Sequence, residues 1–155
     1  MKSKITLAIA GLVIVGAIGT AIAQEASNPA VKARKSIMQL YAFNLGSLGA
    51  MAKGDVEYDA KAATSAANNL VTLTQIDQSR MWPAGSDSSA DASSRALPAI
   101  WQNFPDVMAK GAELSEAVVV MQGAAGQDLE SLRAAMGGIG GACSECHKAY
   151  RAPNN

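Results

Sequence analysis

The chain has 155 residues with 13 Lys and Arg against 13 Asp and Glu, and aromatic residues make up only 5% of it. This balance of charge, without any basic run, argues against nucleic acid as a partner. Ala is abundant and strand-like runs of Val, Ile, Thr and Tyr are missing, so the composition favours helices. So few aromatic residues predict a modest core, which a large apolar cofactor would complete.

The first 23 residues predict a secretory signal peptide. Lys2 and Lys4 precede an uncharged apolar run that ends in Ala21-Ile22-Ala23, the small-residue pattern that a signal peptidase reads. The run is nearly long enough to span a bilayer, so an uncleaved membrane anchor is the alternative. Cleavage after Ala23 leaves residues 24–155 as one domain of 132 residues, with 11 Lys and Arg against 13 Asp and Glu.

Apolar spacing then predicts a first helix over residues 29–53. Asn28 is a plausible N-cap, Pro29 suits the first turn, and Gly54 supplies the stop. Spacings of three and four place one set of residues on a common face: Val31, Arg34, Met38, Tyr41, Leu45 and Leu48.

A second helix is predicted to begin near Asp59 and to run towards Arg80. Its stripe is weaker and consists of Ala63, Ala66 or Ala67, Leu70 and Leu73. Trp82-Pro83 ends this helix, and residues 83–97 form a polar connection. Residues 98–103 follow as a short helix.

Two further long helices are predicted in the second half of the chain. One covers residues 105–122, and the other begins near Asp128 and reaches residue 150. The stripe of the last helix includes both cysteines of the chain: Leu129, Leu132, Met136, Ile139, Cys143, Cys146 and Tyr150. The fold class is therefore all-α, an antiparallel four-helix bundle. A three-helix bundle is the alternative if the Ala-rich second helix does not count.

The sequence Cys143-Ser144-Glu145-Cys146-His147 predicts covalent attachment of one haem c. Cysteines at i and i+3 lie on one helical face, where they match two vinyl groups on one porphyrin edge, and His147 can reach the iron. A thioredoxin-like dithiol, a zinc site and a structural disulfide are the alternatives. Because His147 is the only histidine, the sixth iron position takes Met, Lys, Asn, Tyr or water, or stays open.

At this point the sequence resembles the class II c-type cytochromes, meaning cytochrome c′ and its low-spin relatives. The resemblance covers the mature chain and includes the C-terminal position of the haem motif. It also includes these segments: residues 30–34, Lys53-Gly54, Tyr58-Asp59, Pro83-Ala84-Gly85, Ala99-Ile100-Trp101 and Tyr150-Arg151. It implies a four-helix bundle that holds haem between its helices in the bacterial periplasm.

The resemblance also implies roles for individual side chains. Arg34 and Lys35 match the pair that contacts the haem propionates, and Met38 matches the distal position over the iron. Arg151, four residues after His147, matches a basic residue near the proximal imidazole. Ser86 and Asp87 match positions that approach the haem edge.

Two functions are compatible with such a pocket. If the sulfur of Met38 completes the coordination, the chain is an electron carrier with unchanged ligands in both redox states. If Met38 only packs over the iron, the chain is a five-coordinate haem protein that binds or buffers nitric oxide or carbon monoxide. Residues 45–51 resemble the low-spin branch, which favours the electron carrier.

Other roles are less well supported by the sequence. An enzyme is not expected, because the chain offers no spare histidine and no recognisable acid–base pair. The mildly acidic mature chain would suit redox partner proteins that carry a basic patch. A homodimer through the outer face of the first two helices is a further expectation, with small residues such as Ala62, Ala66 and Ala67 allowing close packing.

Overall fold

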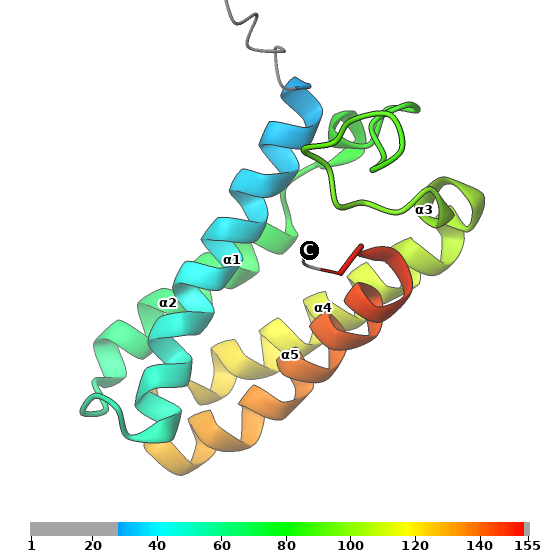
Figure 1. Cartoon of the computed structure of the whole chain (residues 1–155). Coiled ribbons are helices and arrows are strands. Elements are labelled where there is room, and N and C mark those ends of the chain that lie inside the picture. Colours follow the sequence, from blue (N-terminus) through cyan, green and yellow to red (C-terminus); the bar gives the residue numbers. More distant parts are fainter. Residues whose placement is uncertain (1–27, 154–155) are drawn as a thin grey trace, which may run out of the picture.

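The computed structural model describes residues 28–153, and this range holds helices and no β-strand apart from one isolated bridge. Four long helices form its body (Figure 1): α1 (Pro29–Lys53), α2 (Ala60–Thr74), α4 (Phe104–Ala124) and α5 (Leu129–Tyr150). The short α3 (Ala99–Gln102) and a 3-10 turn, η1 (Ser79–Met81), lie between α2 and α4. The predicted all-α antiparallel four-helix bundle is confirmed. The predicted signal peptide lies outside the described residues.

Side chains cap three of the long helices where the sequence predicts a start. The Oδ1 atom of Asn28 accepts a hydrogen bond from the backbone N–H of Ala30 at 2.9 Å, and Asp59 and Asp128 cap α2 and α5 in the same way. α1 ends at Gly54, whose φ of 82° is a left-handed conformation that favours glycine. The predicted bounds of α1 are therefore confirmed.

The predicted extension of the second helix to Arg80 is wrong, because α2 ends at Thr74. Three residues later, Asp77 Oδ1 accepts a hydrogen bond from the backbone N–H of Ser79 at 2.9 Å. Such a local side-chain bond competes with the helical ladder, so the chain turns and continues as the 3-10 turn η1.

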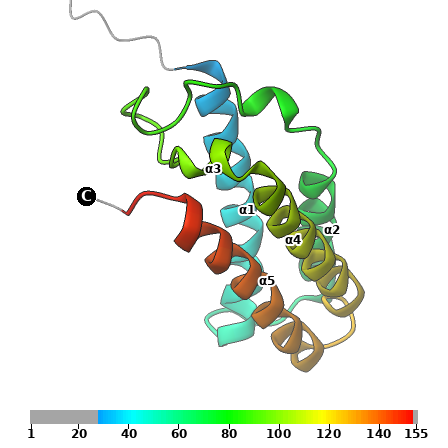
Figure 2. The same cartoon turned by 90° about the vertical axis from the view of Figure 1, so that its right-hand side faces the viewer.

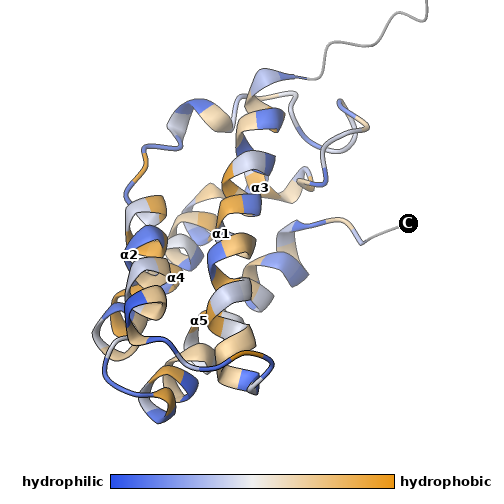
Figure 3. Cartoon of the chain, turned by 90° about the vertical axis from the view of Figure 1, so that its left-hand side faces the viewer, coloured by the Kyte–Doolittle hydropathy of each residue, from blue (hydrophilic) through white to orange (hydrophobic). Residues whose placement is uncertain are grey.

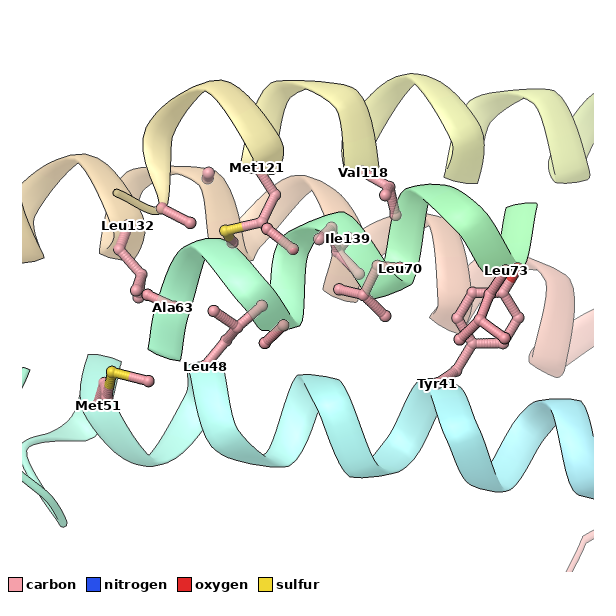
Figure 4. Close-up of a cluster of buried hydrophobic side chains, with 14 of the residues drawn as sticks. Tyr41, Leu48, Met51, Ala63, Leu70, Leu73, Val118, Met121, Leu132 and Ile139 are labelled. Atoms are coloured by element: carbon pink, nitrogen blue, oxygen red, sulfur yellow. The ribbon is translucent and has the colours of Figure 1, made fainter. Parts of the chain in front are cut away.

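The core lies at the end of the bundle away from the chain termini of the described range. Figure 4 shows its side chains pointing toward one another from all four long helices. Ten of them are Tyr41, Leu48, Met51, Ala63, Leu70, Leu73, Val118, Met121, Leu132 and Ile139. The predicted stripe of α2 is confirmed in full, since Ala66 and Ala67 are both buried in this core. These two residues therefore cannot lie on the outer face where a dimer contact was expected, whereas Ala62 is exposed.

The polar segment between α2 and α4 folds over the end of the bundle where α5 finishes (Figures 1 and 2). The backbone N–H of Leu97 donates to the carbonyl of Tyr150 at 3.0 Å, which joins the two segments. Figure 3 shows apolar and polar stretches alternating along each long helix, as expected when each helix buries one face. Within residues 28–153, no helix combines the length and apolar character needed to cross a membrane.

We predict that Leu70→Ala lowers the free energy of unfolding by about 2–5 kcal/mol, because Leu70 is fully buried and its truncation leaves a cavity. Urea denaturation followed by circular dichroism measures this loss. Leu40→Ala is the matched control, since Leu40 lies half-exposed on α1 and should change stability by less than about 0.5 kcal/mol. Equal losses in the two variants would contradict the assigned core.

Candidate functional site

The motif Cys143–His147 lies in the last two turns of α5, where it is held by one continuous helix. Both cysteines are half-buried free thiols, and His147 is half-buried beside them. Burial raises the pKa of the Cys143 thiol, with Arg151 opposing the shift, and burial also raises the pKa of the Cys146 thiol. A reactive dithiol instead needs a lowered pKa, so the thioredoxin-like alternative is disfavoured.

His147 is flanked by two cationic side chains. Its pKa is lowered from the ordinary histidine value, first by burial and then by the positive charges of Arg151 and Arg95. All three influences favour the neutral imidazole, which is the form that binds a metal. Within the described residues, no cluster of three or more His, Cys, Asp or Glu side chains is arranged to hold a bare metal ion.

The buried core stops short of this motif. α4 contains no buried residue before Val118, and α5 contains none between Ile139 and Tyr150. The apolar positions of α4 that point to this end are only partly covered: Phe104, Val107 and Leu114. Met108 on the same helix is 60% exposed. Two thiols and an imidazole therefore border incompletely covered apolar side chains, an arrangement that fits a large, flat apolar group such as haem.

The position of Met38 differs from the simple stripe predicted for the first helix. The buried residues of α1 are Val31, Arg34, Ile37, Tyr41, Asn44, Leu48 and Met51. Met38 and Leu45 lie at the edge of this stripe, and Met38 is 43% exposed. The place on the core-facing stripe that the spacing gives to Met38 is thus taken by Ile37, whereas the position of Met38 over the iron stays a prediction.

Met38 on α1 and His147 on α5 lie at equivalent distances along their helices from a point where the two helices face each other. A Cβ atom built on Gly49 would lie 3.8 Å from the Cε atom of Met136, so this side of α1 faces α5. Met38 lies eleven residues before Gly49, and His147 lies eleven residues after Met136. Eleven residues make about three whole turns of a helix. Met38 and His147 therefore each lie on the side of their helix that makes this contact. Because α1 and α5 are antiparallel (Figure 1), both steps lead to the same end of the bundle.

Arg34 is 6% exposed and ties the polar segment to α1. Its Nη1 atom donates to the Met81 carbonyl and to the Ser86 hydroxyl, both at 2.7 Å, and its Nη2 atom donates to the Ser86 carbonyl and to the Ser94 hydroxyl. The guanidinium carbon lies 4.7 Å from the ring centroid of Trp82 and 5.8 Å from that of Trp101.

These contacts give Arg34 a structural role that the sequence did not reveal. Burial lowers the pKa of the guanidinium, and the charges of Asp91 and Asp87 oppose this shift. The fully buried Ser86 is one of the Arg34 partners, whereas Asp87 accepts bonds from the backbone of Ser89 and Ala90. Helical spacing identified Arg34 as a residue facing inward, but loop residues such as Ser94 have no periodicity that could identify them as partners.

The remaining predicted site residues lie on the surface. Lys35 is exposed on α1, and Arg151 is exposed directly after α5. Arg151 forms an isolated antiparallel bridge with Ala96, and the guanidinium of Arg95 donates two hydrogen bonds to the carbonyl of Ala152. Sequence analysis did not identify Arg95 as a site residue.

Comparison with known proteins gives a consistent result. Residues 29–151 match the family described as Cytochrome C′. Cytochrome c-554 of Cereibacter sphaeroides is 42% identical over 121 residues, which cover 78% of this chain and 91% of that protein. The solved structure of cytochrome c′ from Rhodobacter sphaeroides is similar with a TM-score of 0.79 and 40% identity, over 81% of this chain and 97% of that one. A variant of cytochrome c prime from Alcaligenes xylosoxidans, solved with carbon monoxide bound, has a TM-score of 0.70 and 31% identity over 80% of this chain and 94% of that one.

We predict that Arg34→Met lowers the free energy of unfolding by at least about 3 kcal/mol, because buried hydrogen bonds to a charged group contribute about 1.5–3 kcal/mol each. Hydrogen exchange should also show faster exchange at residues 81–94 than in the unaltered protein. Arg80→Met is the control, since Arg80 is exposed in the turn η1. If Arg34→Met exchanges no faster than the control in this segment, the role assigned to Arg34 is incorrect.

Proposed function

This chain belongs to the cytochrome c′ family, and from that premise we propose that it is a periplasmic electron carrier whose haem iron is held by His147 and Met38. The family binds a single covalent haem c, which the bundle of this chain also takes. In the proposal, Cys143 and Cys146 form the two thioether bonds. The partners of such a carrier are other redox proteins.

The register between α1 and α5 is the single observation on which the assignment of Met38 rests. Counted from the contact between Gly49 and Met136, Met38 and His147 are displaced by the same number of turns toward the same end. A flat group attached at Cys143 and Cys146 would then have an imidazole on one side and a thioether on the other. Met38 is partly exposed in the chain itself, so its sulfur has room to reach a ligand.

The protein side chains account for the properties that an electron carrier needs. Bound haem supplies the exchange of one electron at its iron. Neutral His147 and the neutral thioether of Met38 suit both oxidation states, so the same two ligands stay in place and little reorganisation accompanies transfer. The partly covered apolar side chains of α4 would pack against the haem, Arg34 and Lys35 would provide positive charge for the propionates, and Arg151 would do so on the proximal side.

Gas binding is the second candidate function. It is favoured by the relative that was solved with carbon monoxide, since the fold of that protein admits a diatomic gas. No hydrogen bond involves the side chain of Met38 within the described residues. A thioether also offers no proton, so a pocket under Met38 would suit nitric oxide or carbon monoxide better than anions.

The cellular setting belongs to the proposal as well. Export would use residues 1–23 as a signal peptide and would place the mature domain, residues 24–155, in the periplasm. A carrier rather than an enzyme is proposed, because His147 is the only histidine and is used as the ligand. A homodimer would have to use exposed residues of α1, such as Leu40 and Phe43, rather than Ala66 and Ala67.

The proposed ligation predicts that Met38→Leu changes a low-spin ferric and ferrous spectrum into a high-spin one, because leucine keeps the bulk of the side chain but has no sulfur. The ferrous variant should then bind carbon monoxide at once, as followed by absorption spectroscopy. Met51→Leu is the matched control on the same helix, where the sulfur lies in the distant core.

Two results would contradict the proposed ligation. An unaltered protein that is already high-spin and binds carbon monoxide would favour gas binding over electron transfer. A low-spin spectrum that Met38→Leu leaves unchanged would exclude Met38 as a ligand.

We also predict that Cys143→Ser and Cys146→Ser each leave one thioether bond, while the double variant releases its haem into acidic butanone. The pyridine haemochrome spectrum measures the number of vinyl groups that remain free in each variant. Ser144→Ala is the control, since it lies between the cysteines and should leave both bonds intact. Full covalent attachment in the double variant would show that the haem is held elsewhere.

A further inference from the structure

The surface beside His147 carries a concentrated positive charge that the overall composition does not suggest. A shallow, open cavity of about 440 Å³ is lined by Arg95, Ser144, His147, Lys148, Arg151, Ala152 and Pro153. Three of these side chains are cationic, and none is a carboxylate. The chain as a whole has equal numbers of cationic and anionic side chains, so the three cations mark a local feature.

The helix itself brings two of the three cations together. Ser144, His147, Lys148 and Arg151 follow one another at spacings of three, one and three, which places them on one side of the last turns of α5. Cys143 and Cys146 do not line the cavity. The cations therefore lie on the flank of α5 next to His147, beside the side that carries the thiols.

Arg95 joins this flank from the segment between α2 and α4. Its Nε atom donates to the carbonyl of Ala152 at 3.0 Å, and an Nη2 bond reaches the same carbonyl. The backbone N–H of Ala152 donates back to the carbonyl of Arg95 at 2.8 Å. This reciprocal pairing fixes the guanidinium at the cavity before any partner arrives, which limits the loss of side-chain freedom on binding.

Little in the protein neutralises these charges. Within residues 28–153, the single ion pair joins Lys148 to Glu145 at 2.7 Å, and both side chains are more than half exposed. Such an exposed pair is weak, so Lys148 can leave Glu145 for a stronger anionic partner. Arg95 and Arg151 take part in no ion pair in this part of the chain.

We propose that the surface formed by Arg95, Lys148 and Arg151, the basic face, docks an acidic patch on the protein that exchanges electrons with this chain. The proposal rests on the electron-carrier function proposed above. Docking there brings the partner to the imidazole side of the iron, with His147 at the contact. This surface calls for an acidic partner, whereas the mildly acidic composition suggested a basic one. The two differ because steering depends on the charge nearest the contact rather than on the net charge.

The test uses two oxidants of opposite charge on the ferrous holoprotein at low ionic strength. One electron passes from the ferrous haem to hexacyanoferrate(III), an anion that becomes hexacyanoferrate(II), or to the cation tris(phenanthroline)cobalt(III), which becomes cobalt(II). We expect Arg95→Gln and Lys148→Gln each to slow oxidation by the anion about threefold or more and to leave the rate with the cation unchanged or higher. High salt should remove the difference, since it screens exposed charges.

Matched variants separate the basic face from general effects. Lys61→Gln removes an exposed cation from α2 and should leave the rate ratio of the two oxidants unchanged, while Arg95→Lys should retain most of the rate with the anion. Polyglutamate should inhibit oxidation by the anion more strongly than phosphate does at equal ionic strength. A loss with Lys61→Gln as large as with Lys148→Gln would overturn the proposal, and so would stronger inhibition by phosphate, which would indicate a small-oxoanion site.

The ratio of the two oxidation rates tests the basic face whether or not Met38 binds the iron. If Met38 does not bind the iron, both oxidants react more slowly and carbon monoxide binds, but the rate ratio still reports the basic face. If the basic face is not a docking site, the spectrum stays low-spin while the ratio is the same in all variants.

Discussion

The antiparallel packing of α1 against α5 is the contact on which the rest of the site depends. Gly49 of α1 faces the side chain of Met136 on α5, which gives a reference point for the register of these two helices. In the proposed ligation, Met38 on α1 and His147 on α5 each lie about three turns further toward the open end, where a thioether and an imidazole would face the same group. A shift of one residue in this register would rotate one of the two away from the other, since each residue turns a helix by about 100°.

A second fixed point holds the polar segment that covers the same end. The buried guanidinium of Arg34 donates hydrogen bonds to two carbonyls and two hydroxyls of residues 81–94 and lies against two indole rings. The segment is rich in small polar residues and has little apolar surface to bury. One charged side chain, with its donors in a fixed planar arrangement, therefore holds this segment against the bundle, whereas apolar packing holds the long helices together. The far end of the segment is joined to the chain end by the pairing of Arg95 with Ala152.

The sequence alone predicts the bundle well because helices carry periodic signals. The caps at Asn28, Asp59 and Asp128 and the stripe of α2 were all identified correctly from residue type and spacing. The end of α2 was not, because it depends on a local bond of Asp77 that competes with helix formation. Ile37 and Met38 are adjacent, and spacings of three and four between Arg34 and Tyr41 fit either of them, so the pattern alone did not show that Ile37 is the buried one.

The site was predictable in its chemistry but not in its surroundings. Two cysteines, a histidine and their spacing identify a haem motif whatever the fold is. The partners of Arg34 and the position of Arg95 come from a non-periodic segment, and contacts across 47 to 60 residues of sequence leave no local pattern. The sign of the charge around His147 was likewise hidden, since composition averages over the whole surface.

The uneven distribution of buried residues has a consequence for how the protein matures. The end of the bundle with Leu48, Leu70 and Met121 has a dense core of its own, while the other end, with Cys143 and Cys146, has fewer buried apolar side chains, among them Val31, Ile100 and Tyr150. Local opening is easiest where few apolar side chains are buried, so the second end can separate while the first stays folded. The cysteines would then remain reachable for thioether formation in a chain that is already half-assembled.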